Sequence, residues 1–470
     1  MTHGVPLDTT TGSGRGGWLV TVLAFTGLTS TMVHTALIPV LPQLAPRLGA
    51  DPADVSWTIT VTLLTSAVTL PIAGRLGDTL GKRRVLLACL AALVVGSLVC
   101  GLATSLAPMI LGRGLQGLAT SAIPLGMSIL RDLLPPAGLA SGVAVISATL
   151  GAGGAVMLPV TALIGQVADF HLVFAVTAAL GLLAMLAVRR VVPPDGAPRS
   201  ARFDIPGAVG LTIGLTALLT AVTKGGTWGW AEPLTLGVVG GSALVLVGWA
   251  RWELRTAEPL LDLRVSATAP VLLTNTASLL AGFAMYCNSM VLPQLLQAPT
   301  STGYGLGHSM LVASLCTAPS GLMMMAAAPV SARLTRRLGA KYSLCAGLAV
   351  IAVAYGAASF SMSSTWHLAV ASTVMGLGTG LAFAAMPMLV MAAVPAHQTA
   401  QGNGLNALVR SLGTSLSSAV MAAVLSASAV TVGSHTVAAE SSFRVCLLVG
   451  CGAAVAGLLV ASALRRPTRG

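Results

Sequence analysis

The chain has 470 residues, of which 55% are apolar and only 8% carry a charge. A soluble domain of this length needs more polar surface, and apolar runs of about 20 residues, enough to span a membrane, recur throughout. The formal charge of +12 does not indicate a nucleic-acid-binding protein. Lys and Arg lie in short hydrophilic gaps, and aromatic residues for base stacking make up only 4%. The composition therefore predicts an all-α integral membrane protein without a nucleic-acid partner.

Apolar segments separated by Gly, Pro or charged clusters predict about 14 membrane-spanning helices. They cover residues 18–46, 55–74, 85–104, 108–130, 138–165, 172–188, 206–223, 233–250, 268–297, 308–332, 343–362, 366–392, 401–429 and 443–463. An even number of spans places both termini on one side. If that side is cytoplasmic, 20 of the 25 Lys and Arg residues lie there, and only Arg47, Lys224 and Arg444 lie outside. The positive-inside rule therefore predicts a multi-pass plasma-membrane protein with both termini in the cytoplasm.

A charged segment, residues 74–84 (GRLGDTLGKRR), lies between the second and third predicted spans. Its glycines suit a tight turn, and its basic residues hold the turn in the cytoplasm. Asp78 and the basic side chains beside it are predicted to form a charge-assisted latch that exists only while the cytoplasmic side is closed. The residues assigned to this latch are Gly74, Arg75, Asp78, Gly81, Lys82 and Arg83. The alternative is an ordinary positively charged loop.

Segment 332–341 (ARLTRRLGAK) repeats this pattern, with Arg333 and Gly339 each 258 residues after their counterparts. The second copy has Arg336 where the first has Asp78. Parallel repeats of six spans would be separated by about 200 residues, so the surplus indicates two extra central spans near 206–250. The predicted organisation is a tail (1–17), a six-helix bundle (18–190), a linker (191–204), two extra helices (205–254), a second six-helix bundle (255–464) and a tail (465–470).

Several strings, in order along the chain, resemble the 14-span drug:proton antiporter branch of the major facilitator superfamily. They are residues 74–84, 111–117 (LGRGLQG), 203–207 (FDIPG), 228–230 (WGW), 258–263 (EPLLDL), 401–404 (QGNG) and 410–413 (RSLG). The resemblance covers most of the chain. It implies the major facilitator fold, two six-helix bundles plus two central helices, and export of drugs or antibiotics by alternating access with a proton as the coupled ion.

The chain departs from that branch in three places, and the two that remove an ionisable or phenolic group concern proton coupling. The first span has no acid around residues 28–31 (LTST), and Thr62 stands where a tyrosine is usual. The antiporter motif of the fifth span is loosened, because Gly151 and Gly154 are followed by Pro159 only after four intervening residues. We expect these three residues to serve helix packing and gating, with generic small-residue packing as the alternative. The departures leave transport implied and proton coupling open.

None of the thirteen acidic residues falls in the middle of a predicted span. The residues expected to bind substrate are Arg113, Gln116, His34, Asn403 and Arg410. Arg113 and Gln116 share a helix face, and an arginine favours anionic or carbonyl-rich ligands. The alternatives are structural: Arg113 and Arg410 tied to their surroundings, and His34 as a hydrogen-bonded plug. A permanent cation would find no carboxylate to offset its desolvation.

Other classes of protein lack their signatures here. There is no HExxH, paired carboxylate, GxSxG or His/Cys cluster, so we expect no enzyme activity, metal or cofactor. The sequence has no filter-like string of the kind that channels contain, and it has no soluble domain of the kind that a membrane sensor carries. The sequence predicts a monomeric secondary active exporter of lipophilic small molecules that works in the lipid bilayer with a proton. The alternative is a dedicated exporter or uniporter of one endogenous metabolite or antibiotic without strong proton coupling.

Overall fold

The computed structural model describes residues 12–37, 41–167, 169–196, 203–432 and 435–464. In these ranges thirteen helices are long and apolar enough to cross a membrane. The fourth predicted span is crossed by three short elements that follow one another without a gap: α6 (Leu106–Gly117), the 3-10 helix η2 (Leu118–Ser121) and α7 (Ala122–Leu133). With this broken helix included, the predicted all-α fold of about 14 spans is confirmed.

The spans form two sets of six with an extra pair between them. The N-terminal set is α1 (Gly12–Thr35), α4 (Trp57–Leu80), α5 (Lys82–Gly101), α6–η2–α7, α8 (Pro136–Val167) and α9 (His171–Val191). The extra pair is α10 (Ile205–Trp228) and α11 (Pro233–Arg255). The C-terminal set is α13 (Ala269–Gln297), α14 (Met310–Leu338), α15 (Ala340–Phe360), α16 (Thr365–Ala393), α17 (Thr399–Ala427) and α18 (Glu440–Ser462). We call the two sets the N half and the C half.

Short elements connect the spans. They are α2 (Leu41–Leu48), α3 (Pro52–Val55), α12 (Leu263–Ser266), the 3-10 helices η3 (Thr300–Thr302) and η4 (Ala396–Gln398), and the antiparallel strands β1 (Ala429–Val432) and β2 (His435–Ala438). The prediction of a first span over 18–46 is wrong at its end, because α1 stops at Thr35 and α2 is a separate helix. The sequence has Pro39 and Pro42 in this interval, and proline cannot donate the backbone hydrogen bond that would continue α1.

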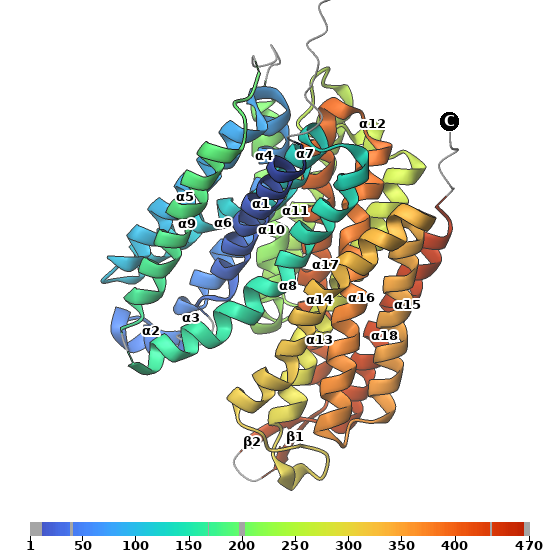
Figure 1. Ribbon diagram of the computed structural model, residues 1–470. Helices are drawn as coiled ribbons and strands as arrows, with labels where there is room; N and C mark the ends of the chain where they lie inside the picture. The colour runs from blue at the N-terminus through green and yellow to red at the C-terminus, as the bar shows by residue number, and fades with distance from the viewer. Residues whose placement is uncertain (1–11, 38–40, 168, 197–202, 433–434, 465–470) are drawn as a thin grey trace, which may run out of the picture.

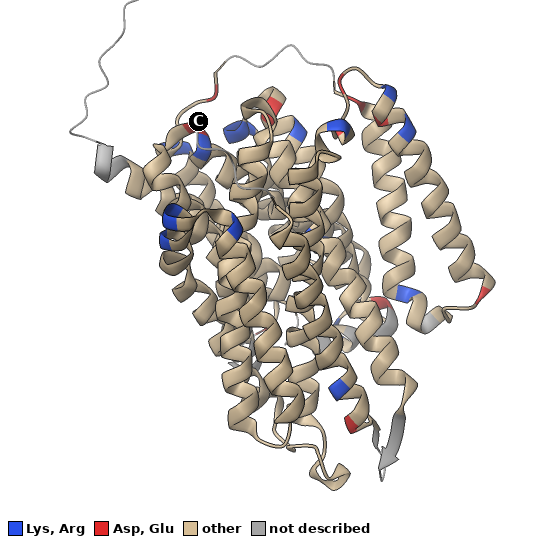
Figure 2. Cartoon of the chain, turned by 90° about the vertical axis from the view of Figure 1, so that its right-hand side faces the viewer, with Lys and Arg blue, Asp and Glu red and all other residues tan. Residues whose placement is uncertain are grey.

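The two halves meet at one end of the molecule and diverge toward the other (Figure 1). They meet where α1 begins and α18 ends, and they diverge toward α2, α3 and the β1–β2 hairpin (Figure 1). Figure 2 shows most Lys and Arg residues gathered at the first of these ends. We call it the basic end; it carries the α4–α5 and α14–α15 turns and the start of α17. The other is the opposite end.

The extra pair is attached through α10. This helix packs against α11, against α4 of the N half and against α17 of the C half. A cluster of buried side chains from α4, α10, α17 and the segment before α12 fills this junction, and includes Leu70, Leu211, Leu261 and Leu408. The extra pair therefore touches both halves at the place where they contact each other.

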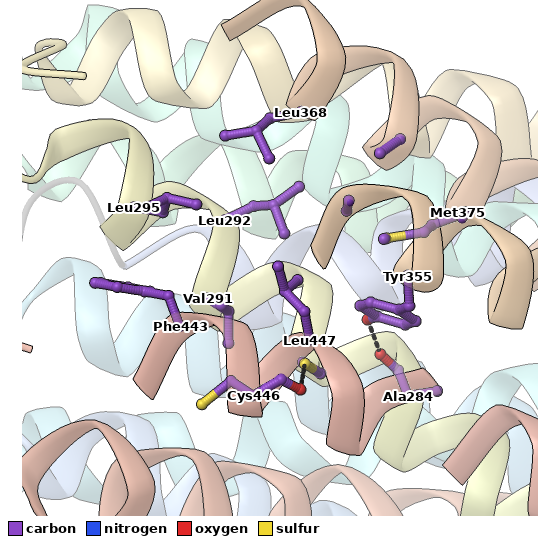
Figure 3. Close-up of a cluster of buried hydrophobic side chains, with 14 of the residues drawn as sticks. Ala284, Val291, Leu292, Leu295, Tyr355, Leu368, Met375, Phe443, Cys446 and Leu447 are labelled. Carbon is purple, nitrogen blue, oxygen red and sulfur yellow. Dashed lines mark hydrogen bonds between the residues drawn. The ribbon is translucent and has the colours of Figure 1, made fainter. Parts of the chain in front are cut away.

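The C half has a continuous core of aliphatic and aromatic side chains (Figure 3). In it, the Tyr355 hydroxyl on α15 donates a hydrogen bond to the Ala284 carbonyl on α13. The thiol of Cys287 on α13 contacts the Cys446 carbonyl on α18 at 3.3 Å. These contacts join α13, α15 and α18 into one packed unit.

Glycines allow α8 of the N half to approach α14 of the C half closely. A Cβ atom on Gly321 would lie 2.8 Å from the Gly151 carbonyl oxygen and 2.9 Å from the Ala155 Cβ. Gly151 itself faces Met324, whereas Gly154 faces Thr35 on α1, inside the N half. Pro159 belongs to α8, but its side chain lies outside the described residues. The gating role of these residues stays a prediction.

Gly321→Ala should lower the stability of the folded protein, because the new methyl group meets a carbonyl oxygen and a Cβ that cannot rotate away. Overpacking of this kind costs about 1–3 kcal/mol. Gly356→Ala on α15 is the matched control, since no atom lies within 4 Å of the added Cβ. Thermal unfolding of the purified proteins in detergent checks this, and equal melting temperatures for both variants would contradict the close approach.

Candidate functional site

The Asp78 side chain lies at the contact between the two halves. From the last turn of α4, its carboxylate accepts hydrogen bonds from the backbone N–H of Ala400 at 3.2 Å and of Gln401 at 2.8 Å. These N–H groups belong to the first turn of α17, where a helix has unpaired donors and partial positive charge. Only 3% of the Asp78 side chain is exposed. One carboxylate thus joins the N half to the C half.

The predicted neighbours of Asp78 contribute less than the sequence indicated. Lys82 Nζ lies 3.9 Å from Asp78 Oδ1, but 2.6 Å from Asp132 Oδ2. Among the described residues no other ion pair involves Asp78. The partner that sequence reasoning missed is the start of α17, and no pattern near residue 78 identifies a helix 322 residues away.

Glycine makes this contact possible. A Cβ atom on Gly74 would lie 2.7 Å from the Ala400 carbonyl oxygen and 2.9 Å from the Gln401 Cα. A Cβ on Gly404 of α17 would collide with the Leu70 carbonyl of α4. The two helices therefore cross with backbone against backbone, which brings the α17 amides within reach of Asp78.

Gly81 and the basic residues after it form the turn into α5. Gly81 has φ +116°, a conformation that side chains rarely adopt. The backbone N–H groups of Arg83 and Arg84 donate to the Asp195 carboxylate at 3.0 and 2.9 Å. Asp195 thus caps α5 as Asp78 caps α17. Gly339 at the α14–α15 turn has φ +105°, so the predicted repeat has the same turn in both halves.

Two further side-chain contacts join the halves at the basic end. Arg131 Nη1 on α7 donates to Thr399 Oγ1 at 2.7 Å. Arg336 Nη1 on α14 donates to Ser141 Oγ on α8 at 2.8 Å. The basic end is therefore closed by polar contacts that water can replace when the halves separate.

Arg113 and Gln116 lie inside the N half and contact each other. Arg113, 1% exposed, donates from Nε to the Thr58 carbonyl and from Nη1 to the Val33 carbonyl and Gln116 Oε1, at 2.8–3.1 Å. Gln116 Nε2 in turn donates to Ser97 Oγ at 2.8 Å. These bonds join α1, α4, α5 and α6, as the structural alternative for Arg113 requires. A substrate role is untested.

His34 belongs to a chain of hydroxyl groups. Its Nε2 lies 2.7 Å from Thr120 Oγ1 on η2, which lies 2.8 Å from Ser66 Oγ on α4. His34 is partly exposed, whereas Ser66 is buried. The arrangement agrees with the hydrogen-bonded plug and also gives the imidazole a polar path into the N half.

In the C half, the predicted site residues Arg410 and Asn403 have fewer hydrogen-bond partners than Arg113 has. Arg410 on α17 stacks on the Phe383 ring at 4.8 Å, and within the described ranges its guanidinium has no hydrogen-bond acceptor. Both amide atoms of Asn403 are buried without a partner there. Asn406, by contrast, donates to Asn275 and Ser278 on α13. Among the described residues Arg410 and Asn403 thus keep polar atoms without a partner, and so does Arg113 at Nη2, whereas the Asn406 amide nitrogen has two acceptors.

A cavity of about 240 Å³ lies beside the Asp78 contact. Its lining comes from α4, from the segment between α11 and α12 and from η4–α17, and includes Arg75, Asp78, Glu258, Asp262, His397 and Gln401. Among the described residues no group of three or more His, Cys, Asp or Glu side chains is arranged to hold a metal ion.

Comparison with known proteins identifies a transporter family. A family model described as Major Facilitator Superfamily matches residues 23–418 and, in a second match, 274–470. The tetracenomycin C resistance and export protein of Streptomyces glaucescens is 27% identical over 418 residues, which cover 87% of this chain and 76% of that protein. A multidrug resistance protein B homolog of Mycobacterium tuberculosis is 26% identical over 412 residues, covering 85% and 74%.

A solved structure shares the fold. The crystal structure of the human organic anion transporter MFSD10 (TETRAN) aligns with a TM-score of 0.66 and 18% identity. The alignment covers 95% of this chain and 99% of that chain. Both molecules thus have the same helical architecture.

Arg113→Lys should destabilise the protein, because an ammonium group cannot reach both carbonyls and Gln116 from one position. Each buried partner left unpaired costs about 1–3 kcal/mol. Arg410→Lys is the matched control, and it should unfold near the wild-type temperature because it breaks no hydrogen bond. Thermal unfolding in detergent measures both, and a stable Arg113→Lys protein would show that this network does not hold the N half together.

Proposed function

Because this chain belongs to the Major Facilitator Superfamily, we propose that it is a secondary active transporter that exports lipophilic small molecules across the plasma membrane by alternating access. The observation that carries the proposal is the Asp78 contact: a reversible, polar joint closes one end while the halves diverge at the other. The relatives named for antibiotic export and multidrug resistance support the direction of transport and the substrate class.

The basic end is proposed to face the cytoplasm. Figure 2 shows the asymmetry of positive charge that the positive-inside rule relates to the cytoplasmic side. In that orientation the structure is closed toward the cytoplasm, and substrate leaves toward the opposite end. To reload, the transporter must open the basic end, which breaks the contacts of Asp78, Arg131 and Arg336 with the other half.

The proposed substrates are neutral or weakly anionic compounds rich in carbonyl or hydroxyl groups. Arg410 offers N–H donors without an acceptor among the described residues, and Asn403 offers a buried amide. The acids on the described spans lie near helix ends, as Asp78 and Glu253 do. A permanent cation would therefore meet the Arg410 charge without a carboxylate to compensate it.

Proton coupling is part of the proposal, with His34 and Asp78 as the candidate carriers. His34 has the hydroxyl chain through Thr120 and Ser66, and Asp78 changes its surroundings when the basic end opens. The second candidate function is an exporter or uniporter of a single compound without strong coupling. The missing acid around residues 28–31 of the first span supports this alternative.

Asp78→Asn should slow transport about tenfold or more while the protein still folds. The amide loses the charge that binds the α17 N-terminus, and hydrogen bonds to a charged group contribute about 1.5–3 kcal/mol. Asp169→Asn is the control, since it removes the charge of an exposed carboxylate that pairs with Arg47 and His171, and such exposed pairs contribute about 0–1 kcal/mol. Efflux rates from proteoliposomes, normalised to folded protein, test the latch, and unchanged kinetics for Asp78→Asn would reject it.

Proteoliposomes with and without an imposed pH gradient test the substrate class and the coupling. Tetracenomycin C, named for a relative, and ethidium, a permanent cation, are the two probes. We expect the efflux of tetracenomycin C to be faster than that of ethidium. We also expect the pH gradient to accelerate tetracenomycin C efflux less in His34→Ala than in the wild type. Strong gradient-driven efflux of ethidium that survives His34→Ala would contradict both parts.

A further inference from the structure

Two buried carboxyl groups lie side by side on the extra helix pair. Asp204, 7% exposed, precedes α10, and Glu253, 1% exposed, lies in the last turn of α11. Both carboxyl groups face Gly207: a Cβ atom there would lie 2.6 Å from Glu253 Oε1 and would also collide with Asp204 Oδ2. Glycine at this position leaves room for the two groups together.

Neutral groups surround this pair. Asp204 accepts from the Gly207 N–H at 2.9 Å and from Trp252 Nε1 at 3.1 Å. Glu253 accepts from Trp249 Nε1 at 2.9 Å and from the Leu261 N–H at 3.3 Å. Within the described ranges no Lys, Arg or His nitrogen lies within 4.0 Å of either carboxyl group.

The elements that carry or adjoin the pair have other charged or titratable side chains, some of which line the cavity beside Asp78. They are Arg251 and Arg255 on α11, Glu258, Asp262 and Arg264 in the following segment, Arg75 and Asp78 on α4, and His397 on η4. Arg264 directs Nη2 to the Leu254 carbonyl. Among the residues that the structure describes, the two carboxyl groups thus have no cation at ion-pair distance. Two adjacent buried anions repel each other and lose hydration, and both effects favour the binding of a proton at such a site.

We propose that Asp204 and Glu253 form a proton-binding site, in which Glu253 holds a proton beside the Asp204 carboxylate while the basic end is closed. This inference deepens the proposed alternating-access function and rests on it. The ligand is the proton itself, and the two tryptophan N–H groups and two backbone N–H groups stabilise the negative charge that remains. In the sequence both acids lie at the ends of predicted spans, and nothing in the pattern there predicts that either side chain is buried.

The site is connected to the Asp78 contact through a short series of bonds. Glu253 accepts from the backbone of Leu261, and the adjacent Leu260 carbonyl accepts from Gln401 Nε2. The backbone N–H of the same Gln401 donates to Asp78 at 2.8 Å. Leu260 and Leu261 are fully buried, so the segment that carries them cannot shift without uncovering the carboxyl pair.

Movement of α17 away from α4 therefore changes the surroundings of Glu253. Separation pulls Gln401 from Leu260, admits water and lowers the proton affinity of the pair. By reciprocity, proton binding stabilises the closed basic end by the same factor. Closure is then favoured at low pH and is lost as the pH rises through the value at which the pair ionises.

Disulfide formation between cysteines introduced at Ser141 and Arg336, with copper phenanthroline as the oxidant and the seven native cysteines replaced by serine, reports closure of the basic end without any substrate. Because the thiolate is the form that is oxidised, each yield is divided by that of a reference cysteine pair at Arg47 and Asp169, which lie in contact within the N half. In the otherwise wild-type protein we expect the cross-linking yield to fall as the pH rises over about pH 5 to 9. Glu253→Gln, which mimics the protonated acid, should keep a high yield throughout. Asp204→Asn provides a second test if Glu253→Gln does not fold. Glu232→Gln, at the exposed start of α11, is the matched control and should titrate like the wild type.

Infrared spectroscopy supplies a direct reading of the proton. The wild type should show the carbonyl stretch of a protonated carboxylic acid, lost on raising the pH and absent in Glu253→Gln. A yield independent of pH in the wild type would overturn the proposal. So would a pH dependence that persists in Glu253→Gln and disappears in Asp78→Asn, because it would assign the proton to the latch. If no substrate is transported while cross-linking follows the expected pattern, the proposed function fails and the proton site stands.

Discussion

The binding of the α17 N-terminus by Asp78 is the interaction on which the arrangement of the two halves depends. It pairs one buried carboxylate with two backbone N–H groups that no other part of α17 can satisfy. Backbone donors need no specific side chain on the partner, so the contact forms only if the helices approach closely enough. Gly74 and Gly404 permit that approach, and a larger residue at either position would move the amides out of reach.

The two halves use their polar residues differently. In the N half, Arg113 and Gln116 hydrogen-bond to α1, α4 and α5, although Nη2 of Arg113 is buried without a partner among the described residues. In the C half, Arg410 rests on an aromatic ring and Asn403 keeps both amide atoms unpaired. Unpaired polar groups inside a membrane protein are costly, which is why these two residues are the ones we propose to contact a substrate.

The extra helix pair contacts both halves of the protein. Because α10 packs on both α4 and α17, it lies beside the joint between the two halves. The segment after α11 reaches the same joint through Leu260 and Gln401. The pair and the residue before it add two buried acids, Asp204 and Glu253, near this joint.

The sequence by itself determined the membrane fold, the number of spans, the repeat and the position of the Asp78 turn. These follow from local composition: apolar length, Gly and Pro at boundaries, and charge in the gaps. Only the tertiary structure decided which groups the polar residues meet. Asp78 was expected to pair with its basic neighbours, yet the backbone N–H that it binds lies 322 residues away. Arg113 and Arg410 both lie within predicted spans, yet Arg113 donates hydrogen bonds to backbone carbonyls whereas Arg410 stacks on an aromatic ring. The physical reason is that a polar group buried in a membrane is defined by its partners, and helix packing brings those partners from distant parts of the chain.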